Sequence, residues 1–430
     1  EVYYYLSGTG VELIKGSVAF NERTCPLGAA TSTDTLIGKS IIIADALTLK
    51  LILAQPAAYL LSSLTYATAW AQPKQLIDKY QDRWTDHLEG FGGNLFTVKR
   101  WDHTGHFDLV RNEAFWGVKP KLREIDWALY KDRDTMWADY QAGTSDSMSS
   151  PPPAALANAK ALPGFHADPD PAITYLTPHW AIAPYNDVRV RQALDLAIDR
   201  TAIAQASHGM LTPSMHMVPQ GVPGYNPDLR DPAGRTGDAA FGPAIAEART
   251  LWQSYVDEKF GGHAEQAPRV ALEYFNNNAL GDTFSPLLMQ EWRAALPGVQ
   301  VSTDIRDRAR AGIDDFLPSL WLTSWTMDYP DPQDFLSLLV HTNSAYNQTF
   351  IDLPEAEKLT DQADANPDQV EQLRQYQQAE QLYVSAVAWI PLGQSLNTYL
   401  VRPAVAGYHE RSASTVALAV WQRISIDTAR

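Results

Sequence analysis

The pattern of hydrophobic and polar positions switches repeatedly between the strand period and the helix period along the chain. Segments 106–112 and 122–130 alternate as strands, and 134–142 has the helix period and is closed by Gly143. The same switch recurs through the second half of the chain. We therefore expect a mixed α/β architecture in more than one lobe.

Helix starts can be placed in the second half from capping residues. Asp187 is positioned to cap a helix with one apolar face, 243–259 and 281–296 have amphipathic helix patterns, and 299–305 alternates as a strand. Near the end, Asn followed by Pro at 366–367 predicts another helix start. Its expected inward-facing residues are Val370, Leu373, Tyr376, Ala379, Tyr383, Val384 and Val387. A buried strand through Trp389, Ile390 and Leu392 is expected to follow.

One stretch, 51–72, carries no charge over about the length of a bilayer-spanning helix. However, leucines alternate with other residues over 47–53, which is the strand period. Pro56 then lies where a new helix could begin. We expect a strand followed by a short helix here, and not a membrane span.

Composition narrows the classes of protein. The 430 residues are enough for two or three domains, and 45% of them are hydrophobic, as in globular proteins. The formal net charge of −16 disfavours nucleic-acid binding. A single cysteine, Cys25, excludes an internal disulfide framework, and its irregular surroundings do not predict a reactive thiolate. The chain begins without Met or a leader-like segment, and we expect it to be a fragment of a longer protein.

Motifs for catalysis and for cofactor binding are absent from the sequence. There is no GxSxG, HExxH, P-loop or dinucleotide-binding pattern. His103 and His106 form the closest histidine pair, but a metal site needs more ligands at coherent spacing. A turn between strands is the favoured interpretation of this pair, and His208 and His216 are interpreted in the same way. We therefore expect no catalytic residues, no metal and no cofactor.

The most unusual segment is SLWLTSWTMDYPDPQDFLSLL, in which a hydrophobic strand leads into Trp325 and three acids. Asp331 precedes Pro332, which is typical of a helix cap followed by Pro in the first turn. Asp334 then falls in the first turn, where the helix dipole favours a carboxylate. These two acids therefore have structural explanations, whereas Asp328 does not.

Asp328 lies at the end of the predicted strand, beside Trp325 and Tyr329. Ligands bind at the carboxyl ends of strands in α/β sheets, and a carboxylate flanked by aromatic rings suits an ammonium group. The alternatives are a solvated loop aspartate and an acid paired with another carboxylate for hydrolysis. The local pattern leaves these possibilities open.

Six blocks, in order, make the chain similar to the family 5 extracellular solute-binding proteins of ABC transporters, the peptide, opine and nickel class. The blocks are LILAQPAAYLLSSLTYATAW, DLVRNEAFWGVKPKLREIDWALYKDRDTMWADYQAG, YNDVRVRQALDLAIDR, VPQGVPGYNPDL, SWTMDYPDPQDFL and AEQLYVSAVAWIPLGQ. They cover nearly the whole chain. Together they are far more specific than any one motif.

The resemblance implies a two-lobed, type II periplasmic-binding-protein-like α/β fold with an extra domain in the first lobe, here incomplete. It divides the chain into the remainder of the extra domain (1–95), a first-lobe segment (96–180), the second lobe (181–395) and a return to the first lobe (396–430). Since the family's first strands should precede Glu1, we expect an unpaired sheet edge and exposed apolar surface.

The implied function is that of a receptor that captures oligopeptides between its lobes and delivers them to the permease membrane subunits of an ABC importer. In the peptide binders, an Asp at the position of Asp328 accepts the ligand's α-amino group, and a Trp at the position of Trp325 lines the pocket. Tyr329 is added as a third ligand contact. The complete protein is expected to be monomeric, and extracellular or periplasmic, either secreted or lipid-anchored.

Two departures from the family pattern bear on the ligand. GGNLFTVK at 92–99 replaces the family's GTGPFK, and Leu322 stands where some tripeptide binders carry an Arg for the ligand carboxylate. Ligand length is therefore left open. The alternatives are a nickel chelate or a sugar as ligand, a carbohydrate hydrolase that uses Asp328 with a partner acid, and an inactive fragment.

Overall fold

The computed structural model describes residues 12–17, 36–92, 94–276, 278–307, 319–344, 346–408 and 418–427. The chain divides into two compact units, of which unit 1 comprises 1–69 and 171–395, and unit 2 comprises 70–170 and 396–430. Two long strands contain the later boundaries, β7 (Phe165–Pro178) and β12 (Ile390–Val401). Each unit is therefore built from two separate segments of the chain.

The main sheet of the described residues has the strand order β10-β9-β11-β7-β12-β6, with β8 also paired to β12. Its further members are β6 (Ser147–Ser149), β8 (Leu211–Pro213), β9 (Val270–Phe275), β10 (Val301–Arg306) and β11 (Leu320–Thr326). β9 pairs in parallel with β10 and β11, and β11 is antiparallel to β7. The part of this sheet in unit 1 carries helices on both faces.

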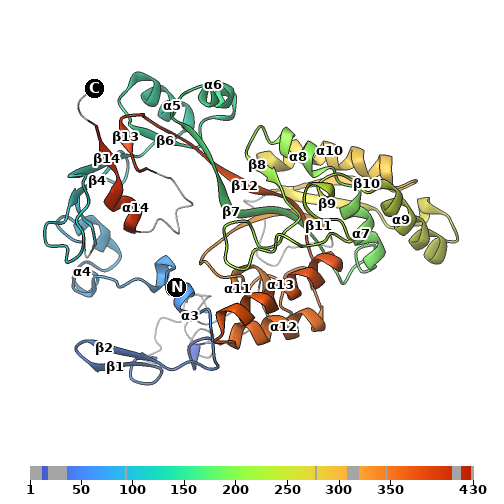
Figure 1. The fold of residues 1–430 in the computed structure, drawn as a ribbon, viewed down its shortest axis with the longest axis horizontal. Coiled ribbons are helices and arrows are strands. Elements are labelled where there is room, and N and C mark those ends of the chain that lie inside the picture. The colour runs from blue at the N-terminus through green and yellow to red at the C-terminus, as the bar shows by residue number, and fades with distance from the viewer. Residues whose placement is uncertain are drawn as a thin grey trace. The chain divides into compact units, whose positions relative to one another are not determined.

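Alternate residues of the strands in unit 1 face two different cores. Leu176, Leu320 and Leu322 contribute to a core with α7 (Val188–Leu196), α8 (Arg200–Ala206), α9 (Ile245–Phe260) and α10 (Ala279–Ala295). Ile173 and Tyr175 contribute to a second core with α11 (Gln333–Leu336), α12 (Pro354–Ala365) and α13 (Gln369–Ser385). In Figure 1, α12 and α13 lie side by side.

Unit 2 contains an antiparallel sheet in the order β3-β4-β5. Its strands are β3 (Phe96–Trp101), β4 (His106–Arg111) and β5 (Glu124–Ala128). The other elements are α4 (Lys74–Tyr80), α5 (Arg133–Ala142), α6 (Leu156–Lys160), β13 (Val405–Ala406), α14 (Leu418–Arg423) and β14 (Ser425–Ile426). A small buried cluster of this unit consists of Tyr140, Met148, Ala159 and Leu400.

The segment that resembled a membrane span forms short elements. β1 (Ile41–Asp45) and β2 (Thr48–Leu51) form a hairpin, and α3 (Leu60–Ser63) follows. The strand was predicted correctly, but Pro56 does not begin the helix, and Leu47 lies outside the strand. None of the described helices is long and apolar enough to cross a bilayer. 3-10 helices occur at Ala67–Ala69, Gln81–His87, Pro153–Ala155, Gly237–Ala240 and Ala264–Gln266.

The strands and helices predicted from periodicity are confirmed within a few residues, and one helix start needs correction. Asp187 caps α7 by accepting from the Arg189 N–H, and Gly143 ends α5 in the left-handed conformation. The cap of α13, however, is Asp368, not Asn366, and its carboxylate accepts from two N–H groups of the first turn. Val370 does not face inward, because it is 81% exposed. The remaining residues predicted to face inward are buried or half-buried.

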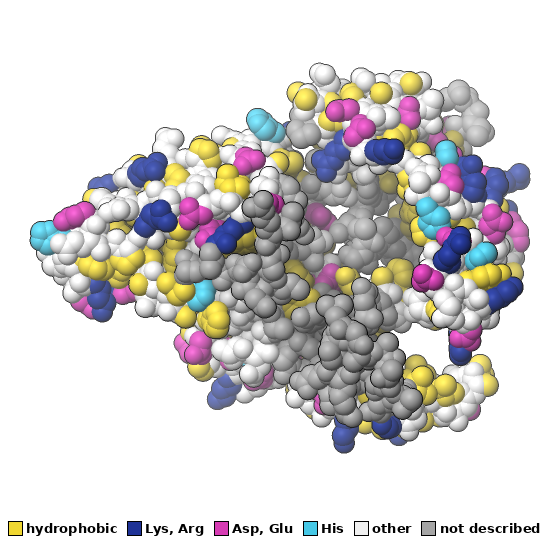
Figure 2. All heavy atoms as spheres, turned by 180° about the vertical axis from the view of Figure 1, so that it is seen from behind, with side chains coloured by type: hydrophobic (Ala, Val, Ile, Leu, Met, Phe, Trp, Pro, Cys, Tyr) yellow, Lys and Arg dark blue, Asp and Glu magenta, His cyan; other side chains and the backbone are white. Residues whose placement is uncertain are grey.

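The described surface mixes charge types. On the face shown in Figure 2, acidic, basic and histidine side chains are interspersed with apolar ones. Several large apolar side chains are also exposed, including Leu61 at 77% and Trp116 at 90%.

Candidate ligand-binding site at the end of β11

The site is built where β11 leaves the sheet and turns into α11. β11 pairs with β7 up to Thr326, which lies opposite Ala172, and the Met327 N–H donates to the Pro171 carbonyl. The alternation of the strand places Trp325 toward the core that contains α11 to α13, on the face opposite Leu322. The next residue after the last sheet hydrogen bond is Asp328.

Asp334, in the first turn of α11, organises this connection. Its side chain is fully buried, and one carboxylate oxygen accepts from the Trp325 indole N–H at 3.1 Å and from the Asp328 backbone N–H at 2.9 Å. Burial raises its pKa well above the usual value, and the nearby charge of Asp328 adds to this effect. Asp334 therefore fixes both the ring of Trp325 and the backbone of Asp328.

Asp331 and Tyr329 support the same connection from inside. The Asp331 carboxylate accepts from the Gln333 N–H at 3.0 Å, as a helix cap does. The Tyr329 hydroxyl donates to the side-chain oxygen of Gln333, and the ring of Tyr329 is only 2% exposed. The expectation that Tyr329 contacts a ligand is therefore not supported by its position, because its side chain belongs to the core.

Asp328 differs from its two acidic neighbours. Its side chain is half-buried, and among the described residues no hydrogen-bond donor or cation contacts its carboxylate. Burial raises its pKa to about 6, with no other cause contributing. A half-buried carboxylate without a partner is costly to keep ionised, and an incoming cationic group would offset this cost.

Trp325 lies beside Asp328 and is half-buried. Its ring makes an edge contact with Tyr346, with 5.4 Å between the ring centroids. Together with the bond to Asp334, this contact holds the indole in one orientation. The arrangement offers an ammonium group both a carboxylate and an aromatic ring.

Sequence reasoning supplied structural explanations for Asp331 and Asp334, but part of the hydrogen-bond network around these acids was not predicted. The first-turn position of Asp334 is confirmed. The residue at the cap position of α11 is Pro332 instead of Asp331, although the Asp331 carboxylate accepts from the Gln333 N–H at the start of the helix. The carboxylate of Asp334 was expected to interact with the dipole of its own helix. It instead accepts hydrogen bonds from Trp325 and Asp328, at the end of the preceding strand. Gln333 and Tyr346 were not predicted to take part, and no motif distinguishes them.

The histidines singled out from the sequence lie at separate places. His216 is buried, which lowers its pKa to about 4, and its Nε2 lies 2.9 Å from the Asn226 carbonyl oxygen. His103 pairs with Asp86 at 2.9 Å. His106, on β4, instead approaches two carboxylates, Asp108 and Asp126, so this group could hold a metal. Cys25 lies outside the described residues.

The comparisons with known proteins agree on a family. The model of the bacterial extracellular solute-binding proteins, family 5, matches residues 17–347, which is more than half of the chain. The chain belongs to this family. The expected resemblance is thereby confirmed.

Curated relatives and solved structures extend this finding. The chain is 23% identical to the oligopeptide-binding protein OppA of Bacillus subtilis, over 80% of this chain and 63% of that protein. It is 26% identical to the probable deoxycholate-binding periplasmic protein YgiS of Escherichia coli, over 85% of this chain and 66% of that protein. The chain therefore spans about two thirds of the length of these relatives.

The structure of the MppA periplasmic murein tripeptide-binding protein, in its unliganded open form, matches with a TM-score of 0.75 at 22% identity, covering 96% of this chain and 77% of that one. Haemophilus influenzae OppA, in complex with the peptide RPPGFSPFR, matches with a TM-score of 0.67 at 18% identity, covering 96% of this chain and 78% of that one. These likenesses confirm the two-lobed periplasmic-binding fold class. The division into lobes and an extra domain at 95, 180 and 395 stays a prediction.

Proposed function

We propose that the protein is the substrate-binding receptor of an ABC importer and that it captures oligopeptides through their N-terminal ammonium group. The observation that carries the proposal is the half-buried carboxylate of Asp328, which has no partner among the described residues and lies beside a fixed indole. An α-ammonium group would form an ion pair with Asp328 and a cation–π contact with Trp325. The receptor role, the permease subunits as partners and the location outside the cytoplasm are inferred from the family.

Relatives of the chain are named for different ligands, and the charge of Asp328 favours one of them. They include proteins named for oligopeptides, for deoxycholate and for haem. Deoxycholate and haem carry carboxylates, which an unpartnered Asp328 would repel. A peptide N-terminus has the opposite charge, so the local electrostatics support the peptide.

The acids closest to Asp328 in sequence do not supply the second carboxylate that a glycoside hydrolase would need. Glycoside hydrolysis needs two carboxyl groups that face the same bound sugar. Asp331 and Asp334, the acids closest to Asp328 in sequence, instead accept hydrogen bonds from backbone N–H groups of the connection. We propose that Asp328 acts in binding and that the protein is not an enzyme.

The test compares peptides with free and with acetylated N-termini, in the intact protein and in Asp328→Asn. Removing one partner of a buried charge pair costs about 2–5 kcal/mol, so Asp328→Asn should weaken free peptides about 30-fold or more. Acetylated peptides should bind the unaltered protein as weakly as free peptides bind Asp328→Asn. The substitution should not lower the affinity for acetylated peptides further. Isothermal titration calorimetry measures all four affinities.

A matched control is Asp352→Asn, which removes an exposed aspartate of the same unit. This variant should bind free peptides as the unaltered protein does. Equal affinity of the unaltered protein for free and acetylated peptides would refute the role of Asp328. Mass spectrometry of the small molecules released on denaturing the purified protein is a second test. If no short peptide binds and none is released, the proposal that the ligand is a peptide is wrong.

A further inference from the structure

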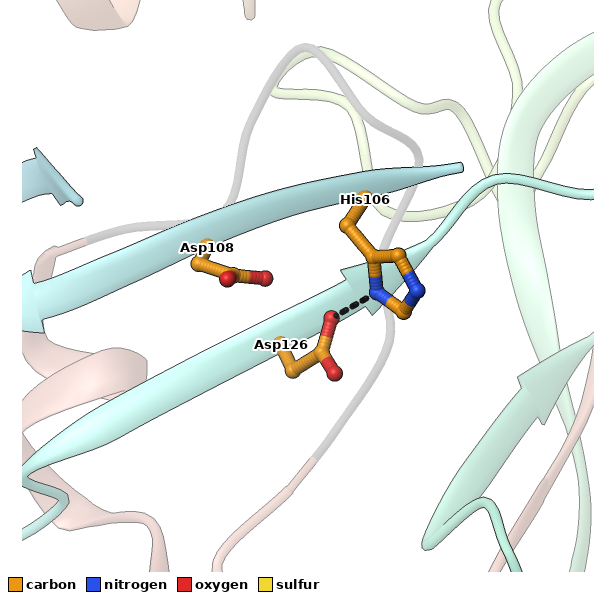
Figure 3. A group of neighbouring side chains, drawn as sticks. All are labelled: His106, Asp108 and Asp126. Carbon is orange, nitrogen blue, oxygen red and sulfur yellow. Dashed lines mark hydrogen bonds and ion pairs between the residues drawn. The ribbon is translucent and has the colours of Figure 1, made fainter. Parts of the chain in front are cut away.

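A second group of ionisable side chains lies in unit 2, on the sheet formed by β3, β4 and β5. His106 and Asp108 are two residues apart on β4 and therefore point to the same face of the sheet, and Asp126 projects from the neighbouring β5 (Figure 3). The nitrogen or oxygen atoms that these three side chains offer all lie within 4.8 Å of one another.

The pairing of the strands places two carboxylates directly opposite each other. Asp108 and Asp126 are partners in the antiparallel register of β4 and β5. Like charges at such positions are destabilising, because the side chains of opposite residues are close. Arg100 of β3 donates a hydrogen bond to Asp108 at 2.9 Å. The positive charge of this guanidinium does not offset the two carboxylates, because it also interacts with Asp102.

Asp108 supplies an independent sign that a cation belongs in this group. The residue is only 6% exposed, and while one carboxylate oxygen accepts from Arg100, the other is buried without a hydrogen-bond partner. This unpartnered oxygen lies within the group formed with His106 and Asp126 and is therefore a candidate ligand atom.

We propose that His106, Asp108 and Asp126 bind a divalent transition cation such as Zn²⁺. Imidazole nitrogen and carboxylate oxygen are ligands that Zn²⁺ takes at about 2.0–2.2 Å, and three protein ligands leave a position for water. Such bond lengths bring ligand atoms to about 3.4 Å from one another. His106 and Asp126 can close to this spacing because their side chains are 41% and 55% exposed.

The surroundings of the three residues fit a cation site in two further respects. Arg100 holds the carboxylate of Asp108 in place, as hydrogen-bonding partners of metal ligands do. His106 and Asp126 are open to solvent, with 41% and 55% of their side chains exposed, and this exposure provides a path for the ion. Asp102 is not a ligand, because its carboxylate accepts from the backbone N–H groups of His106, Gly105 and Thr104.

The competing explanation is a plain ion pair between His106 and Asp126, whose atoms lie 2.8 Å apart. The test is calorimetric titration of untagged, chelator-treated protein with Zn²⁺ at pH 7.5. One equivalent should bind, and His106→Gln and Asp126→Asn should each weaken binding at least tenfold. Anomalous X-ray scattering at the zinc edge should place the ion between β4 and β5.

The matched control is His263→Gln, because His263 and Glu265 form another exposed histidine–carboxylate pair at 3.1 Å. This variant should bind Zn²⁺ as the unaltered protein does. No binding by the unaltered protein, or binding that persists in both His106→Gln and Asp126→Asn, would overturn the proposal. Circular dichroism should show that the variants are folded, as the exposure of both altered residues predicts. The outcome is independent of peptide binding, since Asp328 belongs to unit 1.

Discussion

At the scale of single residues, the burial of Asp328 has a consequence for pH. Its pKa of about 6 in the free protein means that the carboxyl group is charged at pH 7.5, but largely protonated at pH 5. An ammonium ligand favours the charged form, so binding at pH 5 must first release a proton. We expect the association constant for peptides with a free N-terminus to fall about tenfold from pH 7.5 to pH 5.

Calorimetry in buffers of different ionisation enthalpy measures both the affinity and the released proton. Asp328→Asn should bind with little pH dependence over this range, because the titrating group is gone. An unaltered protein whose affinity is the same at both pH values would contradict the assignment.

The sequence allowed part of this site to be predicted, because capping is a local property. Asp331 precedes a proline at a helix start, and its role follows from that neighbourhood alone. The bond from Trp325 to Asp334 depends on the angle at which α11 follows β11, which no local pattern encodes. The burial of Tyr329 has the same origin. The approach of Asp126 to His106 could not be predicted either, because the two residues become neighbours only through the pairing of β4 with β5.

At the scale of secondary-structure elements, α10 packs closely on β9 at Gly281. A Cβ atom added to Gly281 would lie 2.2 Å from the ring of Tyr274, whose hydroxyl is held by Asp282. We expect Gly281→Ala to destabilise the protein by about 1–3 kcal/mol, as overpacking does. Chemical denaturation measures the change.

Gly242→Ala is the control for this prediction, because nothing lies within 4 Å of its added Cβ atom. It should change the stability by about 0.5 kcal/mol or less. If both variants have the same free energy of unfolding as the unaltered protein, α10 does not pack on β9 as closely at Gly281 as the structure shows.

Periodicity predicted helices such as α9 and α10 because each of them buries one apolar face in the core of unit 1. The start of α13 was misplaced because Asn366 and Asp368 are both good capping residues. Both in fact accept backbone hydrogen bonds, Asn366 from the Asp368 N–H and Asp368 from the helix. Local sequence does not decide between two such neighbours.

At the scale of the whole molecule, burial is distributed unequally between the two units. β9 and β11 of unit 1 contain runs of buried residues, whereas β5 of unit 2 has none and β4 has one. Amides in regions with few buried contacts exchange through local opening. We therefore expect hydrogen exchange, followed by mass spectrometry, to be slower in β9 and β11 than in β4 and β5. Equal protection in the two sheets would show that unit 2 is stabilised by something other than its small core.

The division of the chain could not be predicted from patterns along it. Boundaries within β7 and β12 fall inside continuous strands, so no glycine-rich or polar linker marks them. The family resemblance suggested a return of the C-terminal segment to an earlier lobe, which periodicity alone does not reveal.

The pairing of Ser147–Ser149 with Tyr399–Val401 has a consequence for synthesis of the protein. Domains generally fold as they emerge from the ribosome, starting from the N-terminus. Here unit 2 begins at residue 70, but its second segment starts only at residue 396. β6 must therefore wait for Tyr399–Val401 before it can pair, and contacts of such long range form slowly. The edge of β6 therefore stays unpaired until this later segment has been synthesised, and an unpaired strand edge is a site at which chaperones can bind.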